Sequence, residues 1–329
     1  MMSLYACGPE SGTSENMDTQ AISDSLSVNG RISDLSTQID EDPDNAELYY
    51  ERAKEYVEER DLNKAITDIQ TAISMDSTDA RYHAVLGDIF YAGSKIYNAR
   101  DALIRSVELD GQMVEPRVRL AEIYLILKEH KSSVLMLNEV VELEPGNITA
   151  YFMRGMNFKE AGDTLNAVAD FQKVVSLDQE YYDAHMQLGV IMQAKNDPSA
   201  LGYFNNCLDL RPTAEEAMYG RALWYQEHDE LNKAIQDYTS IITINPANKN
   251  AHFNLGYIHQ VLLQVYDAAI GHYSNALKAD PQYLEAYYNR GLCYESLGNI
   301  EAAFADYQAA AALRPGYTPA EEGMKRVGG

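Results

Sequence analysis

Small and apolar residues recur along most of the chain at spacings of three and four, the period of a helix with one buried face. The pattern is clearest at residues 284–315, where two trios each fall on one helical face: Tyr287, Gly291 and Tyr294, then Ala303, Tyr307 and Ala310. Gly298 interrupts the pattern between the trios, and Pro315 ends it because proline cannot continue a helix. The pattern predicts a helical hairpin that needs copies of itself as neighbours to bury its apolar faces.

Eight copies follow one another, at residues 46–79, 80–113, 114–147, 148–181, 182–214, 215–248, 249–283 and 284–317. Each first helix has a small residue: Ala53, Gly87, Ala121, Gly155, Gly189, Ala222, Gly256 and Gly291. Each second helix has another: Ala65, Ala99, Ser133, Ala167, Ala200, Ala234, Ala269 and Ala303. A bulky residue follows it: Ile69, Leu103, Leu137, Phe171, Phe204, Tyr238, Tyr273 and Tyr307. We expect the two helices to touch at the small residues.

Changes of repeat length are predicted to fall in turns. The fifth copy is one residue shorter than the usual 34, and the seventh is one longer. We expect the changes at Asn196-Asp197-Pro198 and near Leu263-Gln264, because turns tolerate them best.

Single helices are predicted to cap both ends of the array, because a repeat array must cover its terminal apolar faces. Residues 29–45 are predicted as the N-terminal capping helix, with residues 1–28 as a disordered acidic tether before it. Residues 318–329 are predicted as the C-terminal capping helix. Its start has the pattern of a capping box, in which Thr318 accepts from first-turn amides and Glu321 reaches back.

The eight copies resemble tetratricopeptide repeats over about four-fifths of the chain. The resemblance implies an all-α fold, a tetratricopeptide-repeat α-solenoid in which antiparallel helical hairpins stack into a right-handed superhelix. It also implies that the first helices line a concave groove. The third copy, with Arg117 and Ser133, departs furthest from the family pattern.

Four repeats share a charged pair that the other four lack. Arginine precedes the first small residue and aspartate precedes the bulky residue: Arg52 with Asp68, Arg154 with Asp170, Arg221 with Asp237 and Arg290 with Asp306. The other repeats have no aspartate before the bulky residue, and leucine takes the place of the arginine: Leu86, Leu120, Leu188 and Leu255. Because a partly buried guanidinium needs an acceptor, we predict an Arg–Asp pair within each of the four hairpins. Shared ancestry without contact is the alternative.

The charge balance and the motifs exclude several functions. With 26 basic and 50 acidic residues the formal net charge is −24, which argues against nucleic acid or an anionic membrane as partner. No apolar run is long enough to span a membrane. No phosphate loop, nucleophile elbow or HExxH motif is present, so we predict no enzyme activity, no cofactor and no metal site.

Three of the seven histidines and two of the three cysteines are predicted to have packing roles. His83, His185 and His252 occupy a first-helix position that holds bulky residues in other repeats, and His228 and His272 lack an obvious partner. His252 and His259 are too far apart for the one-turn spacing of a helical metal pair. Cys207 and Cys293 fall at inward-facing positions, where cysteine acts as a small apolar residue.

The resemblance places two positions of each first helix in the groove. In repeats four to eight these positions are apolar or aromatic: Phe152 and Met156, Met186 and Val190, Tyr219 and Leu223, Phe253 and Tyr257, and Tyr288 and Leu292. Asn254 and Asn289 lie beside them and could hydrogen-bond a peptide backbone. Chaperone-binding members of the family hold a carboxylate with lysines at these positions, so an acidic chaperone tail is not expected here. The alternative is that no ligand binds here, because a tight superhelix covers the stripe or the N-terminal segment folds back over it.

The N-terminus resembles the end of a bacterial lipoprotein signal, with Leu4, Ala6 and Cys7 in the required order and a polar segment after them. The basic and apolar segments that precede such a site are missing. Cys7 is therefore a candidate lipidation site and lipid anchor if the start is truncated. In that case we expect a bacterial envelope lipoprotein, and otherwise a cytoplasmic protein.

The sequence thus predicts a non-enzymatic scaffold that binds a protein partner, as a peptide or helix, in an apolar concave groove. The alternative is an envelope-tethered structural assembly factor whose groove is filled by its own chain or another copy.

Overall fold

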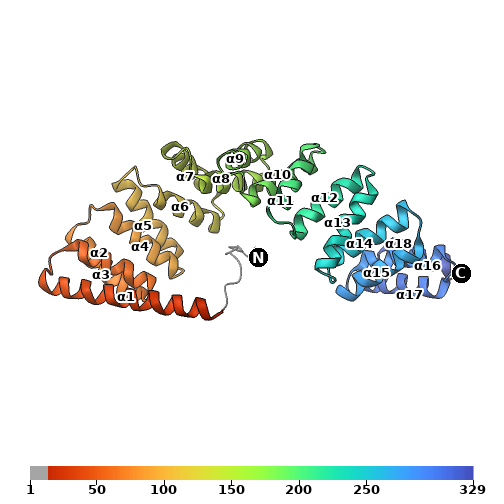
Figure 1. Cartoon of the computed structure of the whole chain (residues 1–329), viewed down its shortest axis with the longest axis horizontal. Coiled ribbons are helices and arrows are strands. Elements are labelled where there is room, and N and C mark those ends of the chain that lie inside the picture. Colours follow the sequence, from red (N-terminus) through yellow and green to blue (C-terminus); the bar gives the residue numbers. More distant parts are fainter. Residues whose placement is uncertain (1–13, 329) are drawn as a thin grey trace. The chain divides into compact units, whose positions relative to one another are not determined.

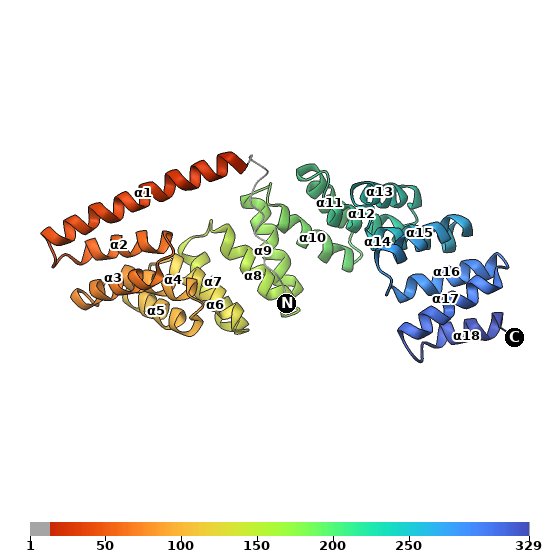
Figure 2. The same ribbon diagram turned by 90° about the horizontal axis from the view of Figure 1, so that it is seen from below.

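The computed structural model describes residues 14–328, with side chains from Val28 onward, and all regular elements in that range are helical. The chain divides into two compact units, residues 1–162 (unit 1) and 163–329 (unit 2), and each is described by itself. Figures 1 and 2 show each unit as a row of antiparallel helices in sequence order.

Unit 1 begins with the long helix α1 (Ser14–Glu41), which runs alongside α2 (Figure 2). Three hairpins and a single helix follow: α2 (Ala46–Glu58) and α3 (Leu62–Met75), α4 (Ala80–Ala92) and α5 (Ile96–Leu109), α6 (Glu115–Ile126) and α7 (His130–Leu143), then α8 (Ile148–Glu160). Each helix packs on the next one, so every hairpin covers the apolar face of its neighbour.

Unit 2 continues the same alternation. Its helices are α9 (Thr164–Leu177), α10 (Tyr182–Ala194), α11 (Ser199–Leu210), α12 (Glu215–Glu227), α13 (Leu231–Ile244), α14 (Lys249–Tyr257), η1 (Ile258–Leu262), α15 (Tyr266–Ala279), α16 (Leu284–Ser296), α17 (Ile300–Leu313) and α18 (Thr318–Val327). The first helices α10 and α12 also touch each other directly, as do α16 and α18. The first helices therefore form one layer of the unit and the second helices the other.

The residues predicted to build the hairpins form the core. The small residues of the second helices and the bulky residues after them are all buried, with exposed fractions of 0–1%. The close approach of the two helices of the seventh hairpin requires glycine, because a β-carbon on Gly256 of α14 would lie 2.7 Å from the Tyr273 ring of α15. Cys207 and Cys293 are fully buried, as predicted, and burial raises the pKa of each thiol to about 12.

Three of the four predicted Arg–Asp pairs form within one unit, each through two hydrogen bonds. The distances are 2.7 and 2.9 Å for Arg52–Asp68, 2.8 and 2.8 Å for Arg221–Asp237, and 2.8 and 2.7 Å for Arg290–Asp306. The prediction is confirmed for these three. Arg154 and Asp170 belong to different units, so their pairing stays a prediction.

Each paired arginine also reaches a third helix. It donates to a side chain sixteen positions earlier, on the preceding second helix or on α1: Ser36 for Arg52, Asn205 for Arg221 and Ser274 for Arg290. Because α1 supplies this acceptor for the first repeat, it occupies the place of a preceding second helix. This contact supports the predicted capping role of α1.

The seventh repeat accommodates its extra residue differently from the prediction. We expected the insertion in the turn near Leu263-Gln264, but the end of the first helix widens into the π-helix η1. The turn itself keeps the left-handed residue found in the other hairpins, with Gln264 at φ 56° where Gly298 has 76°. A π-turn absorbs one residue without breaking the helix, and this leaves Val261, Leu262, Leu263 and Val265 exposed.

Two predictions about the chain ends are wrong in detail. Helix α1 begins at Ser14, so residues 14–28, expected to belong to the tether, are helical. Their polar composition concealed a stripe with Ile22 and Leu26 one turn apart, and no proline interrupts residues 10–42. The N-cap of α18 is Tyr317 and makes no side-chain cap, so Thr318 does not form the predicted capping box.

Helix α18 packs on the last hairpin. Ala320 is fully buried against Tyr307 and Ala310, and Met324 and Val327 pack on the same cluster. The candidate lipidation site Cys7 lies outside the described residues. No helix in the described part of the chain is long and apolar enough to span a membrane.

Candidate functional site

Ten of the twelve predicted groove residues lie in unit 2, on four successive first helices. They are Met186 and Val190 on α10, Tyr219 and Leu223 on α12, Phe253, Asn254 and Tyr257 on α14, and Tyr288, Asn289 and Leu292 on α16. All are half-buried except Val190, which is 42% exposed. Phe152 and Met156 are on α8 in unit 1, so the structure does not place them relative to the other ten.

The aromatic residues of this stripe rest on the buried tyrosines of their own hairpins. Ring centroids are 5.7 Å apart for Tyr219 and Tyr238, 5.5 Å for Phe253 and Tyr273, and 5.9 Å for Tyr288 and Tyr307. A second ring flanks two of them, Tyr283 beside Phe253 at 5.0 Å and Tyr317 beside Tyr288 at 5.7 Å. The core thus holds each ring in place while part of it remains accessible.

The two predicted backbone-binding asparagines already use one amide hydrogen each. Asn254 Nδ2 donates to the Tyr219 hydroxyl at 2.9 Å, and Asn289 Nδ2 donates to the carbonyl oxygen of Glu285 at 2.8 Å. An asparagine amide carries a second hydrogen and an acceptor oxygen. Those groups are what each residue can offer to a ligand.

An open pocket of about 550 Å³ adjoins the stripe where α12 and α14 begin. Tyr219 lines it together with Glu215, Glu216, Asn248 and Asn250. Glu216 Oε1 accepts a hydrogen bond from the Tyr182 hydroxyl at 2.6 Å. Glu215 Oε2 accepts from Asn248 at 2.7 Å and from Asn245 at 3.2 Å. Sequence reasoning did not identify this pocket, because it is formed by residues from three successive repeats.

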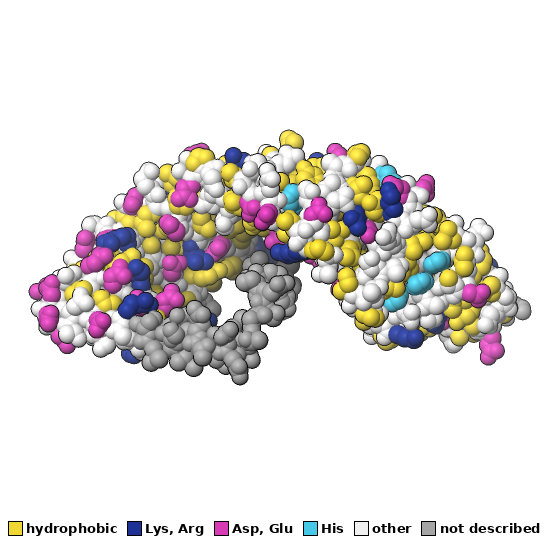
Figure 3. Space-filling view, in the orientation of Figure 1, with side chains coloured by type: hydrophobic (Ala, Val, Ile, Leu, Met, Phe, Trp, Pro, Cys, Tyr) yellow, Lys and Arg dark blue, Asp and Glu magenta, His cyan; other side chains and the backbone are white. Residues whose placement is uncertain are grey.

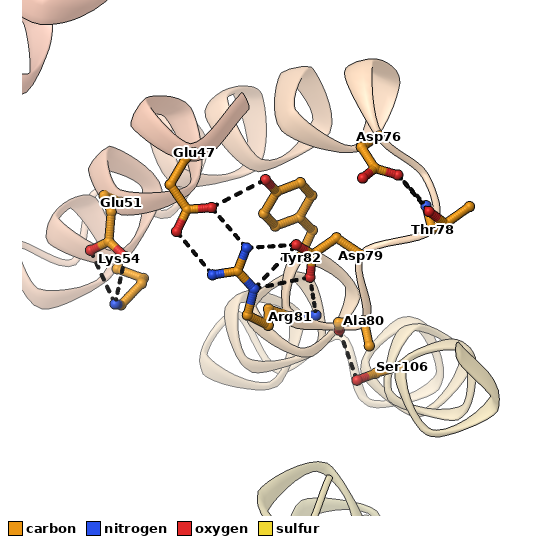
Figure 4. Close-up of polar contacts among 10 residues, drawn as sticks. All are labelled: Glu47, Glu51, Lys54, Asp76, Thr78, Asp79, Ala80, Arg81, Tyr82 and Ser106. Carbon is orange, nitrogen blue, oxygen red and sulfur yellow. Dashed lines mark hydrogen bonds and ion pairs between the residues drawn. The ribbon is translucent and has the colours of Figure 1, made fainter. Parts of the chain in front are cut away.

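In unit 1 the residue that corresponds to Glu216 in the repeat register is Glu47, and it forms an ion pair within the unit. The guanidinium of Arg81 on α4 donates to both oxygens of Glu47 on α2, at 2.9 and 2.8 Å, and also bonds Asp79 (Figure 4). Tyr82 OH lies 3.4 Å from the same Glu47 carboxylate. The carboxylate at the second position of the first repeat is therefore paired with an arginine from the next repeat.

Three histidines of the seventh repeat form a cluster that the sequence reasoning missed. The Nδ1 atoms of His252 and His272 are 3.5 Å apart, and the rings of His259 and His272 stack with centroids 5.4 Å apart. His252 Nε2 lies 3.1 Å from the carbonyl oxygen of Pro246 and is therefore the protonated nitrogen, because a carbonyl can only accept. In Figure 3, histidine side chains gather at the surface in the region of α14 and α15. His272 thus contacts two other histidine rings, a relation that the sequence analysis did not identify.

The repeat register explains how the cluster arises. In the eighth repeat, Arg290 lies between the rings of Tyr287 and Tyr294, with its guanidinium carbon 5.7 and 5.9 Å from their centroids. In the seventh repeat Leu255 stands at the position of Arg290, and a histidine stands at the position of each residue around it. His252 corresponds to Tyr287, His259 to Tyr294, and His272 to Asp306, the partner of Arg290. Three neutral rings thus fill the space of an ion pair and its two flanking tyrosines.

The cluster is expected to make folding depend on pH. Burial lowers the pKa of His272 to about 4, helped by the charges that His259 and His252 would carry, and burial also lowers the pKa of His252 and His259. In the unfolded chain a histidine has a pKa of about 6.5. The unfolded state therefore binds more protons below that value, so stability present above pH 6.5 is lost as the pH falls toward 4.

Urea titrations at several pH values measure this dependence. We expect the free energy of unfolding of the wild type to fall more steeply between pH 6.5 and 4 than that of His272→Leu. The difference between the two proteins isolates the histidine from the titration of the carboxylates. Equal slopes would contradict the assignment.

His83 and His185 have the packing roles that were predicted, and His228, for which no partner was expected, stacks on an aromatic ring. His83 and His185 point Nε2 at the carbonyl oxygens of Ser77 and Gln179, at 3.1 and 2.9 Å. His228 stacks on Trp224 with centroids 3.9 Å apart. Within residues 14–328, no group of three or more His, Cys, Asp or Glu side chains could hold a metal ion.

Three family models, each described as tetratricopeptide repeat, match the chain. One matches residues 46–79 and 148–181, another matches residues 216–248, and the third matches residues 263–318. The chain carries tetratricopeptide repeats. Solved repeat proteins share the fold: the C-terminal part of a TPR repeat-containing protein from Cytophaga hutchinsonii has a TM-score of 0.61 at 16% identity, over 68% of this chain and 93% of that one. A tetratricopeptide repeat protein from Parabacteroides merdae has a TM-score of 0.54 at 14% identity, over 76% and 99%. The predicted all-α solenoid is confirmed.

Curated relatives of this repeat chain are longer proteins. The BBSome complex member BBS4 homolog of Drosophila melanogaster is 23% identical over 71% of this chain and 50% of its own length. Human tetratricopeptide repeat protein 16 is 22% identical over 83% of this chain and 35% of its own length. The chain thus spans half or less of the length of these two relatives. Tetratricopeptide-repeat proteins are generally non-catalytic scaffolds for protein–protein interaction, and these matches support a scaffold role for the chain.

Proposed function

We propose that the first-helix layer of unit 2 binds a peptide or a helix of a partner protein. The observation that carries the proposal is the stripe of half-buried rings and aliphatic side chains on α10, α12, α14 and α16. Aromatic side chains that the core already holds in place lose little conformational entropy on binding, which makes them effective anchors. The second hydrogens and the oxygens of Asn254 and Asn289 are available to fix the register of a bound backbone.

Replacing Phe253 and Tyr257 by glutamate tests this proposal. Two charges in the stripe oppose burial of an apolar ligand, so we expect partners captured by the wild-type chain to be lost from the double variant. Affinity capture followed by mass spectrometry, with circular dichroism to verify folding, gives the comparison. Leu165→Glu is the matched control, because Leu165 is 77% exposed on α9, outside the stripe.

A second variant covers the case in which loss of the Phe253 packing unfolds the seventh repeat. Val190→Glu changes the most exposed residue of the stripe, so the fold should survive while capture weakens. Partners retained by both variants would contradict the proposal. If partners are retained while self-association changes, the alternative is favoured, in which the chain's own copies occupy the groove.

A further inference from the structure

The two units treat the same groove-edge carboxylate in different ways. Glu47 and Glu216 are the second residues of repeats one and six, and Arg81 and Asn250 are the second residues of the repeats that follow. Arg81 neutralises Glu47 through two hydrogen bonds. In unit 2 an uncharged asparagine stands where the arginine would be, and both Asn250 and Glu216 line the open pocket.

No cation of the described chain replaces the missing arginine. Neither Glu215 nor Glu216 has a Lys, Arg or His nitrogen within 4.0 Å in the part of the chain that carries side chains, and the hydrogen bonds they accept come from neutral groups. The nearby basic residues form no ion pair with either glutamate. Arg211 lies over the Tyr182 ring at 4.0 Å, and Lys249 is paired with Asp280. Among the described side chains, the two carboxylates that line this pocket therefore have no ion-pair partner, and Arg211 is the cation beside them.

The pocket is continuous with the apolar stripe through one residue. Tyr219 lines the pocket and also belongs to the stripe, and its hydroxyl accepts from Asn254 on the next first helix. A ligand that covers Tyr219 thus passes beside Glu216. The 550 Å³ volume is large enough for one long side chain.

We propose that the ligand of this groove is a basic-apolar peptide, with an arginine side chain in the pocket against Glu216 and apolar residues on the adjoining stripe. The proposal rests on the proposed function of the groove and adds the chemistry of the partner. Arginine is favoured over lysine because its planar fork can engage a carboxylate through two hydrogen bonds, as Arg81 does with Glu47. Glu216 is exposed, so its contribution is moderate and falls as salt concentration rises.

The probe is a phage-displayed library of random short peptides selected on the full chain. The best peptide is then synthesised in two forms, with arginine or with its neutral isostere citrulline, and its Kd is measured by fluorescence anisotropy. We expect selected peptides to carry arginine at a fixed distance from apolar residues. On the wild type, citrulline should weaken binding about tenfold, equivalent to about 1.4 kcal/mol.

Two variants locate the effect. On Glu216→Gln both peptides should bind equally, whereas Glu47→Gln in unit 1 should leave the tenfold difference unchanged. The inference alone fails if peptides require Phe253 and Tyr257 but show no preference for arginine, or if the difference persists on Glu216→Gln. If no peptide depends on Phe253, Tyr257 or Val190, the proposed function fails and this inference with it.

Discussion

Phe204→Ala should cost about 3–5 kcal/mol of unfolding free energy, the usual range for a buried phenylalanine. The Phe204 ring is fully buried and lies between two glycines of different repeats. A β-carbon on Gly189 of α10 would be 2.7 Å from the ring, and one on Gly220 of α12 would be 2.5 Å away. Removing the ring therefore leaves a cavity both within the fifth hairpin and at its interface with the sixth.

Urea unfolding monitored by circular dichroism measures this cost. The matched control is Phe304→Ala on α17, because Phe304 is 38% exposed and its truncation should cost about 1 kcal/mol or less. In a repeat array stability depends on interfaces between neighbours, so the loss should appear in the transition of unit 2. An equal or smaller loss for Phe204→Ala than for Phe304→Ala would show that this ring does not join the two repeats.

Asp237→Ala should be the second most damaging change, at about 2–3 kcal/mol. Asp237 is 5% exposed and receives two hydrogen bonds of 2.8 Å from Arg221, which also donates to Asn205. Removing one partner of a buried pair leaves an uncompensated charge and costs about 3–5 kcal/mol. We expect less here because a quarter of the Arg221 side chain is exposed, and water partly screens its charge.

The chain supplies its own control for this experiment. The second repeat has Leu86 where the sixth has Arg221, and Ala102 where the sixth has Asp237. The double variant Arg221→Leu, Asp237→Ala should therefore recover most of the stability lost by Asp237→Ala, since an apolar pair can replace a buried ion pair at little cost. Urea midpoints of the three proteins make the comparison. A double variant as unstable as the single one would show that the loss does not come from the stranded arginine.

Contacts inside one hairpin could be predicted from the sequence, because each depends on a fixed helical spacing. The small residues at the helix contact, Tyr307 in the core and the Arg290–Asp306 pair all follow from a register that eight copies define. The chain ends were harder to predict. Only one copy of each exists, so composition concealed the helical residues 14–28, and the Thr318 pattern suggested a cap that does not form.

Contacts between neighbouring repeats were missed for a different reason. The Glu47–Arg81 pair and the pocket beside Glu216 depend on how one hairpin packs on the next, which helical spacing does not specify. The histidine cluster could have been found, because its residues occupy the places of Tyr287, Tyr294 and Asp306 in the repeat register. Considering each histidine singly hid this relation.

Photo-crosslinking from the proposed groove tests the central claim most directly. A benzoylphenylalanine at position 257 lies in the stripe on α14, and one at position 239 replaces the exposed Thr239 on α13, in the other layer of unit 2. We expect a partner captured by the wild type to crosslink at position 257 and not at position 239, and the crosslink to disappear when Val190→Glu is added. Equal crosslinking at both positions, or crosslinking at 239 alone, would place the partner outside the groove and contradict the proposal.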